Sequence, residues 1–365
     1  MSNEESTKPL RLLSLDGGGI PALSQLTILK SITLAIQQQH ALAAPPRPHE
    51  IFDLIGGSGH GGLLALLLGR LRLTIDETLT EYRQLVERVF SHRKRHRGGR
   101  GQYSARAMEA AIKDLVGRYA PPRHPDAETM LLLEDNANHA EGEGEGEGEG
   151  ETGCKVLVCV RSTQAMEHAR LFCSYRTYRA GDDPDLTVWQ AARAVTAHPG
   201  LFKPVRIGDE EFVDGSLGTK NPGRLLLDEA RRLFDGERRP VGCVLSLGAG
   251  KPPPVQLGRP GLFQRLLPTK IVSVVEALSF EAETVAQDLE GRFEHSPGVY
   301  FRFNVGERVA GVGMADWERW SEVESQTVDY LAAFEVQNTV LRAAEALYGK
   351  ALEKGTDTAV TVFDL

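Results

Sequence analysis

A turn built almost entirely from small residues joins two apolar stretches early in the chain. Ile51–Ile55 precedes the turn, Leu63–Leu68 follows it, and the turn reads GGSGHGG over residues 56–62. A strand, a sharp turn and a helix in this order form a nucleophile elbow, whose backbone bends too tightly for side chains on both flanks. An elbow presents one side chain for attack on a carbonyl carbon. The pattern therefore predicts strand, turn and helix over Ile51–Leu68, with the chemistry at the turn.

A second glycine-rich turn lies one strand earlier. Leu10–Leu15 is an apolar run typical of a buried strand, Asp16–Gly19 reads DGGG, and apolar residues with helical spacing follow. Backbone N–H groups in such a loop can bind an anion or a developing oxyanion. Gly17, Gly18 and Gly19 are thus candidate donors, although an ordinary tight turn has the same composition.

Both turns resemble those of the patatin-like phospholipases, a family of lipid acyl hydrolases. The family elbow reads F-D-x-I-x-G-T-S-T-G-G-L-I-A, and its nucleophilic serine falls on Gly59, which has no side chain. Ser58 and His60 stand where the family has the threonines that flank this serine. The resemblance implies a patatin-like fold with an elbow built by Gly57, Gly59 and Gly61. The positions that match the family pattern are Phe52, Asp53, Ile55, Gly57, Gly61, Gly62, Leu63, Leu64 and Ala65.

The glycine loop also departs from the family pattern, which reads D-G-G-G-x-R-G. The resemblance assigns the oxyanion hole to Gly17, Gly18 and Gly19, but Pro21 replaces the family's arginine and Ala22 its last glycine. Proline removes a cationic side chain and one backbone donor, which weakens the expected oxyanion hole.

A third resemblance concerns the acid of the catalytic dyad. The stretch FVDGSLG over residues 212–218, followed by Asn221 and Pro222, is similar to the family's F-x-D-G-G-L-x-x-N-P. The resemblance implies that Asp214 is the dyad aspartate, which takes the proton of the attacking serine. Ser216 stands where the family motif ends in glycine or alanine, and His198 lies on a loop that we expect to approach Asp214.

The missing serine leaves three functional hypotheses open. The first is a non-catalytic, lipid-binding module, because loss of a nucleophile costs orders of magnitude in rate. The second is an acid/base enzyme on an apolar metabolite that uses His60, His198 and Asp214. The third is a hydrolase rescued by Ser58, which needs the turn to shift by one residue, or by a water activated by Asp214. In the simplest interpretation the two histidines have no role.

The length and composition allow one large α/β domain or two small ones. The chain has 365 residues, of which 41% are hydrophobic. The resemblance implies a single three-layer α/β/α patatin-like sandwich over residues 8–350, with a mainly parallel central sheet and tails at 1–7 and 351–365. Buried strands are predicted at 10–15, 51–55, 155–160 and 244–248. Helices are predicted at Asp76–Phe90, with Asp76 as N-cap, and at Ile271–Leu289 and Trp320–Leu347.

An acidic low-complexity segment interrupts this pattern. Residues 141–151 read EGEGEGEGEGE and contain nothing that could be buried. We therefore predict an inserted, disordered loop over 134–153, with no function beyond solvation. A formal net charge of −8 argues against nucleic acid as a partner.

The remaining expectations concern location and partners. The chain shows no signal peptide and no membrane-spanning run, so we expect a cytoplasmic protein that acts on a lipid or another apolar small molecule. The basic run His92–Arg100 is either a solvated loop or a peripheral contact with anionic lipid headgroups. The four cysteines are scattered, which favours buried thiols over disulfides or zinc, and we expect no metal and no cofactor.

Overall fold

A computed structural model describes residues 8–94, 101–121, 126–133, 153–177, 185–234, 239–251, 269–306, 309 and 311–349, with backbone only for 269–280. Three predicted segments lie outside the described residues: the expected tails, all but the last residue of the acidic insertion at 134–153, and residues 95–100 of the basic run His92–Arg100.

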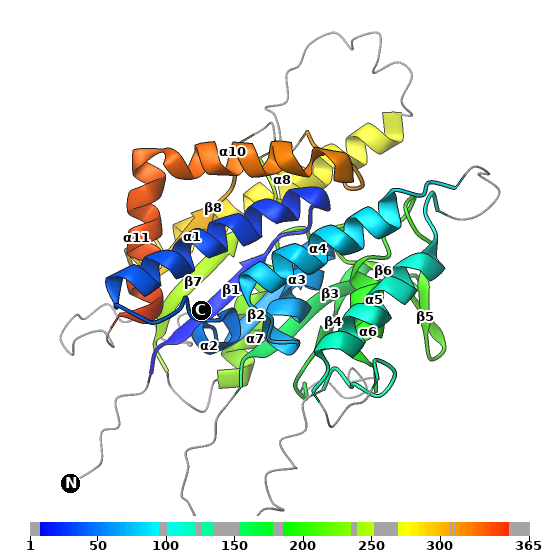
Figure 1. Cartoon of the computed structure of the whole chain (residues 1–365), viewed down its shortest axis with the longest axis horizontal. Helices are drawn as coiled ribbons and strands as arrows, with labels where there is room; N and C mark the ends of the chain where they lie inside the picture. The colour runs from blue at the N-terminus through cyan, green and yellow to red at the C-terminus, as the bar shows by residue number, and fades with distance from the viewer. Residues whose placement is uncertain are drawn as a thin grey trace, which may run out of the picture.

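The core of the protein is an 8-stranded mixed sheet with the order β5-β6-β3-β2-β1-β7-β8, in which β4 also pairs with β3 (Figure 1). The four central pairings, β3 with β2, β2 with β1, β1 with β7 and β7 with β8, are parallel. The strands are β1 (Leu10–Leu15), β2 (Leu54–Ser58), β3 (Lys155–Ser162), β4 (Ala165–Cys173), β5 (Val205–Ile207), β6 (Glu210–Asp214), β7 (Val241–Leu247) and β8 (Tyr300–Phe303).

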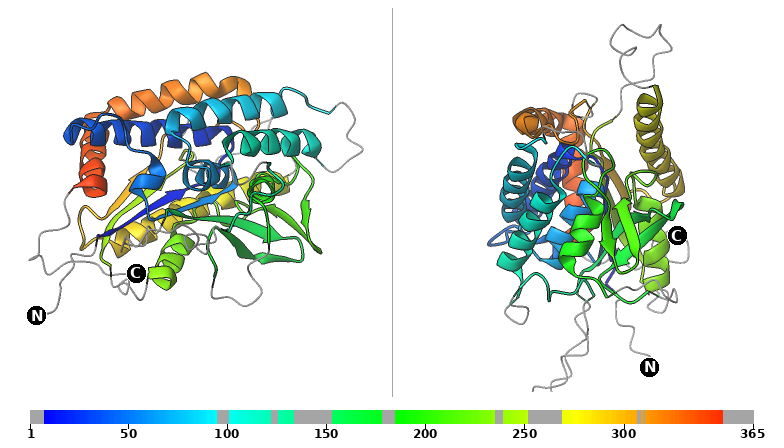
Figure 2. Two further views of the ribbon diagram at one scale, coloured as in Figure 1. Left: turned by 60° about the horizontal axis from the view of Figure 1, so that its bottom comes forward. Right: turned by 90° about the vertical axis from the view of Figure 1, so that its right-hand side faces the viewer.

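Helices cover both faces of the sheet, as the predicted α/β/α sandwich requires. Alternate residues of each central strand belong to two separate apolar clusters, one on each face of the sheet. Leu13 and Leu12 of β1, for example, point to opposite layers. Among the described residues, one face carries α7 (Gly223–Phe234) and α8 (Thr269–Arg292) (Figure 2). The opposite face carries α1 (Leu23–Gln39), α3 (Gly59–Ala65), α4 (Ile75–Phe90), α5 (Ala105–Tyr119), α6 (Val188–Val195), α10 (Trp320–Ala332) and α11 (Phe334–Tyr348).

The strand that leads into the elbow differs from the prediction at its start. Ile51 ends a short helix, α2 (Pro48–Ile51), and β2 begins only at Leu54. The Asp53 backbone still bonds to both neighbouring strands, because its amide donates to the Arg11 carbonyl oxygen and its carbonyl oxygen accepts the Lys155 amide, each at 2.9 Å. Its carboxylate also accepts the Arg11 amide at 2.8 Å and the Arg239 guanidinium at 2.6 Å. Two other strands were predicted nearly correctly: β1 has the expected bounds, and β3 runs two residues longer than 155–160.

Two helix predictions were wrong in detail. Thr74, not Asp76, is the N-cap of α4, because its hydroxyl accepts the Glu77 amide while the Glu77 carboxylate accepts the Thr74 amide. The single helix predicted for Trp320–Leu347 is α10 and α11, separated by the extended residue Ala333. The break lets α11 turn across the end of α10 and bury its apolar side chains in the core (Figure 1). No helix in the described part of the chain is long and apolar enough to cross a membrane.

The four cysteines, all within described segments, are buried and form no disulfide. Burial raises the pKa of the Cys159 thiol to about 12, so this thiol stays protonated at neutral pH.

Candidate active site

Three chain segments meet at one edge of the sheet. The glycine loop follows the end of β1, the elbow follows the end of β2, and Asp214 ends β6 opposite Val160 of β3. The pairing of Leu15 with Gly57 brings the first two turns side by side. This edge, at the carboxyl ends of parallel strands, is where open α/β sheets place their ligands.

Gly59 occupies the bend of the elbow. Its φ of +53° lies in the left-handed region, where residues with side chains are strained. A Cβ placed on Gly59 would lie 3.2 and 3.3 Å from the two carboxylate oxygens of Asp214. A side chain at position 59 would therefore point at the Asp214 carboxylate, and glycine has none.

The neighbouring glycines are required by close packing. A Cβ on Gly61 would come within 2.5 Å of the carbonyl oxygens of Leu15 and Asp16. A Cβ on Gly57 would lie 2.3 Å from the Gly61 carbonyl oxygen. The sharp turn therefore requires glycine at positions 57 and 61.

Asp214 is fully buried, with an unsatisfied oxygen. Its Oδ1 accepts the Ser216 amide at 2.8 Å, while Oδ2 has no hydrogen-bond partner among the described residues. Burial raises the pKa of Asp214, although a positive charge on His198 and contacts with Ser216 lower it. A buried carboxylate with a free oxygen and a raised pKa is suited to accept a proton.

Ser58 lies beside the elbow but on a different face of β2. Gly56, two residues earlier, has its Cβ direction toward Leu226 of α7, and strand alternation gives Ser58 the same direction. The Ser58 side chain is fully buried, and its hydroxyl has no hydrogen-bond partner in the described part of the chain. Ser58 is therefore directed toward the α7 layer rather than into the bend.

His60 is held by a hydrogen-bond chain rather than by Asp214. The Tyr82 hydroxyl donates to the Gly19 carbonyl oxygen at 2.8 Å, so its oxygen accepts from His60 Nδ1 at 2.6 Å. This arrangement fixes the neutral tautomer with the proton on Nδ1. Burial, together with the charge of His198, lowers the pKa of His60 to about 4.

His60 is therefore expected to make the protein less stable in acid. Its pKa is about 4 in the folded chain against 6.5 when unperturbed, so between these values only the unfolded state takes up the proton. His60 leaves the free energy of unfolding unchanged above pH 6.5. As the pH falls toward 4, it lowers this free energy by about 3 kcal/mol. Urea unfolding at pH 7, 5 and 4 should show this extra loss in the parent chain but not in His60→Thr, which carries the family residue. Equal pH slopes would refute the expectation.

His198 is the histidine that the structure brings toward Asp214. It is half-buried, its Nδ1 has no hydrogen-bond partner among the described residues, and its charge acts on both Asp214 and His60. The expected trio thus gathers in one region, but the hydrogen bond of His60 goes to Tyr82.

The glycine loop offers two backbone donors. The Gly17 amide already donates to the Lys220 carbonyl oxygen at 2.9 Å. The amides of Gly18 and Gly19 donate to no acceptor within the described segments. Of the three predicted donors, these two thus carry no hydrogen bond to the described part of the protein. Pro21 lies in a short 3₁₀ helix, Ile20–Ala22, and contributes neither an N–H nor a charge.

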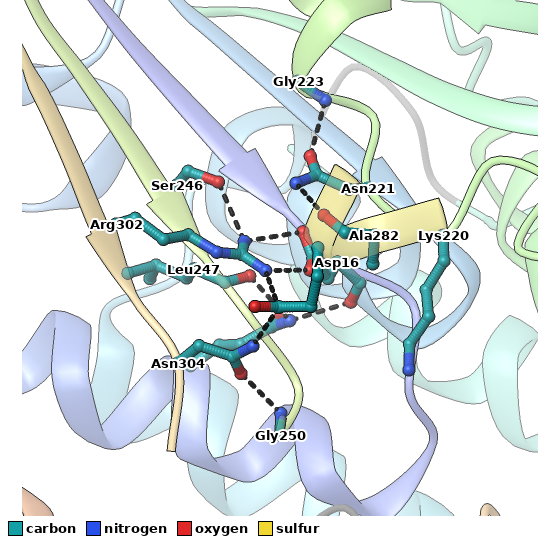
Figure 3. A network of polar contacts seen from close by, with 12 residues as sticks. Asp16, Lys220, Asn221, Gly223, Ser246, Leu247, Gly250, Ala282, Arg302 and Asn304 are labelled. Atoms are coloured by element: carbon teal, nitrogen blue, oxygen red, sulfur yellow. Dashed lines mark hydrogen bonds and ion pairs between the residues drawn. The ribbon is translucent and has the colours of Figure 1, made fainter. Parts of the chain in front are cut away.

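The loop is anchored at Asp16 by a buried ion pair (Figure 3). Arg302 of β8 donates to both carboxylate oxygens of Asp16, at 3.1 and 2.7 Å, and to Ser246 Oγ at 2.9 Å. Gln25 Nε2 donates to the Asp16 carbonyl oxygen at 2.8 Å. Burial raises the pKa of Asp16, and the Arg302 charge opposes this shift. The network fixes where the glycine loop starts.

Ser216 is the site residue to which the sequence analysis gave no role. Its hydroxyl oxygen lies 3.3 Å from the point that a Cβ on Gly59 would occupy. The only signal in the sequence was the departure of Ser216 from the glycine or alanine of the family motif.

Comparisons with known proteins agree with this arrangement of turns. A family model described as patatin-like phospholipase matches residues 13–227, which include both glycine turns and Asp214. Calcium-independent phospholipase A2-gamma of Homo sapiens is 26% identical over 310 residues, which cover 81% of this chain and 34% of the relative. The chain thus spans about a third of the length of this relative.

Other relatives carry different descriptions. Phospholipase A I of Arabidopsis thaliana is 23% identical over 364 residues, covering 88% of this chain and 27% of the relative. A protein described as probable inactive patatin-like protein 9, also from Arabidopsis thaliana, is 25% identical over 243 residues, 61% of this chain and 54% of its own length. Among solved structures, VipD from Legionella pneumophila aligns with a TM-score of 0.38 and 12% identity, over 88% of this chain and 67% of VipD.

Proposed function

Because the chain belongs to the patatin-like phospholipase family, we propose that it is a lipid acyl hydrolase scaffold whose elbow no longer supplies the nucleophile. Hydrolysis of lipid esters by the usual Ser-Asp dyad is then weak or absent. The observation that carries this proposal is the geometry at Gly59, whose Cβ direction points at both oxygens of Asp214.

The groups around this gap support binding of an acyl ester. In a dyad mechanism the aspartate takes the serine proton, the serine attacks the carbonyl carbon, and backbone amides stabilise the oxyanion. Asp214 and the open amides of Gly18 and Gly19 supply two of these three parts. An ester carbonyl bound between them would be polarised but would meet no hydroxyl from position 59.

The acid/base hypothesis receives less support. A histidine with a pKa of about 4 is neutral at physiological pH, and His60 has its Nδ1 proton committed to Tyr82. It is therefore a poor general acid in this position. His198 and Asp214 remain the pair that could move a proton in this region.

The proposal also includes a lipid surface as partner. His92, Arg93 and Lys94, the described part of the basic run, are exposed at the end of α4. Each such cation near an anionic membrane contributes about 1 kcal/mol of attraction, which salt screens.

Binding and turnover can be measured together with vesicles that contain a fluorogenic phosphatidylcholine. The full chain is expected to float with vesicles that contain phosphatidylserine, to detach as salt is raised, and to release little fatty acid. Rapid release, abolished by Asp214→Asn, would contradict the proposed loss of hydrolysis. If the fraction of protein that floats with the vesicles does not change with salt or with anionic lipid content, the role of the basic run is contradicted.

A further inference from the structure

The space that the elbow serine would fill contains another hydroxyl. Ser216 Oγ lies 3.3 Å from the Cβ position of Gly59 and 3.4 Å from the Cβ position of Gly17, so it stands between the elbow and the glycine loop. We propose that Ser216 is the nucleophile of this chain and that the slow ester hydrolysis left to it passes through an acyl group on Ser216. This inference rests on the proposed function, since it assumes that an acyl ester binds between these loops.

Asp214 is placed to act as the base for Ser216. The Ser216 amide holds Asp214 Oδ1 at 2.8 Å, and both the amide and the side chain of Ser216 stabilise the ionised carboxylate. Oδ2 is left without a hydrogen-bond partner among the described residues, in a fully buried position. Serine and aspartate are thus neighbours in one turn, with one carboxylate oxygen open to a proton.

The glycine loop makes room for this serine and faces it. A Cβ on Gly17 would lie 2.6 Å from the Ser216 Cβ, so glycine at position 17 is what allows the serine side chain to fit. The next two amides, of Gly18 and Gly19, are open donors for the oxyanion. Ser58 has no comparable surroundings, because its side chain is directed toward the α7 layer.

The proposed reaction balances as an ordinary ester hydrolysis. The Ser216 Oγ–H proton passes to Asp214 as Oγ bonds to the ester carbonyl carbon, and the carbonyl π electrons move onto the oxyanion. Collapse of the oxyanion breaks the bond to the alkoxide, which takes the proton from Asp214 and leaves as alcohol. Water then attacks the acyl carbon and gives a proton to Asp214. The bond from this carbon to Ser216 Oγ breaks, Oγ takes the proton from Asp214, and the fatty acid leaves.

The test is where an ester-mimicking fluorophosphonate attaches to the unmodified full chain. Peptide mass spectrometry is expected to find the phosphonate on Ser216, with labelling lost in Asp214→Asn. Phosphonate on Ser58 or on another residue would overturn the inference, as would an unlabelled parent under conditions that label Gly59→Ser. Because the parent itself is mapped, this result does not depend on a variant that folds.

Kinetics of p-nitrophenyl butyrate hydrolysis give the second readout. Ser216→Ala carries a residue of the family motif and should fold; we expect its kcat to fall at least about 10-fold while KM changes little. Ser91→Ala, at an exposed position, is the matched control with unchanged kcat. Equal kcat in Ser216→Ala and the parent would refute the inference.

The double variant Gly59→Ser, Ser216→Ala separates the two proposals. If it hydrolyses the ester while the parent fails, only the Ser216 inference falls; if it too is inert, the proposed function falls.

Discussion

Gly59→Ser is expected to raise ester hydrolysis about 100-fold or more over the parent chain. The new Cβ would lie 3.2 to 3.3 Å from both Asp214 oxygens, which puts a hydroxyl within reach of the base. Removing the nucleophile from a catalytic unit typically costs several orders of magnitude, so restoring it should recover a large part. Pro21 limits the gain, because the cation and donor that the family has at this position are missing.

The comparison needs a control for backbone strain. A serine at positive φ costs about 1–2 kcal/mol of stability wherever it is placed. Gly208 has a φ of +57°, against +53° for Gly59, and no atom lies within 4 Å of its Cβ position. Gly208→Ser should therefore show the cost of positive φ alone and gain no activity. Adding Asp214→Asn to Gly59→Ser should abolish the gain; a gain that survives it would show that Asp214 is not the base.

Arg302→Met is expected to destabilise the protein by about 3–5 kcal/mol at neutral pH. The Arg302 and Asp16 side chains are 7% and 2% exposed, and removing the arginine leaves a buried carboxylate without its counter-charge. Urea unfolding of the two chains measures the loss.

Two further observations make this prediction specific. Without Arg302 the already raised pKa of Asp16 rises further. In the folded variant the Asp16 carboxyl therefore stays protonated to a higher pH than in the unfolded chain. The destabilisation should therefore shrink as the pH falls and the carboxyl is neutralised. Arg319→Met removes an arginine from a pair with Glu322 in which both side chains are 42% exposed, and it should cost no more than about 1 kcal/mol. Equal losses in the two variants would refute the special role of the Asp16 pair.

Local sequence patterns were enough to predict the scaffold. Apolar runs bounded by glycine turns located β1, β3 and the elbow, because buried parallel strands carry continuous apolar sequence. The boundary errors have local causes that the apolar pattern does not contain. The short helix α2, which ends at Ile51, delays the start of β2, and the Thr74 hydroxyl caps α4 in place of Asp76.

The site was less predictable because it depends on long-range contacts. Resemblance pointed to Asp214, but the use of the Gly17 amide by Lys220 and the pairing of Asp16 with Arg302 join residues far apart in the sequence. The position of Ser216 in the gap beside Gly59 also follows only from the packing of β6 against the elbow. The break at Ala333 likewise reflects packing of α11 on the core rather than helix propensity.

Presentation of position 59 to Asp214 by the elbow is the central claim. Its most direct test is fluorophosphonate mapping of the double variant Gly59→Ser, Ser216→Ala, in which no competing hydroxyl remains beside Asp214. We expect rapid attachment of the phosphonate to the serine introduced at position 59, and loss of this labelling when Asp214→Asn is added. Attachment to Ser58 instead, or no attachment in a variant that unfolds cooperatively, would contradict it.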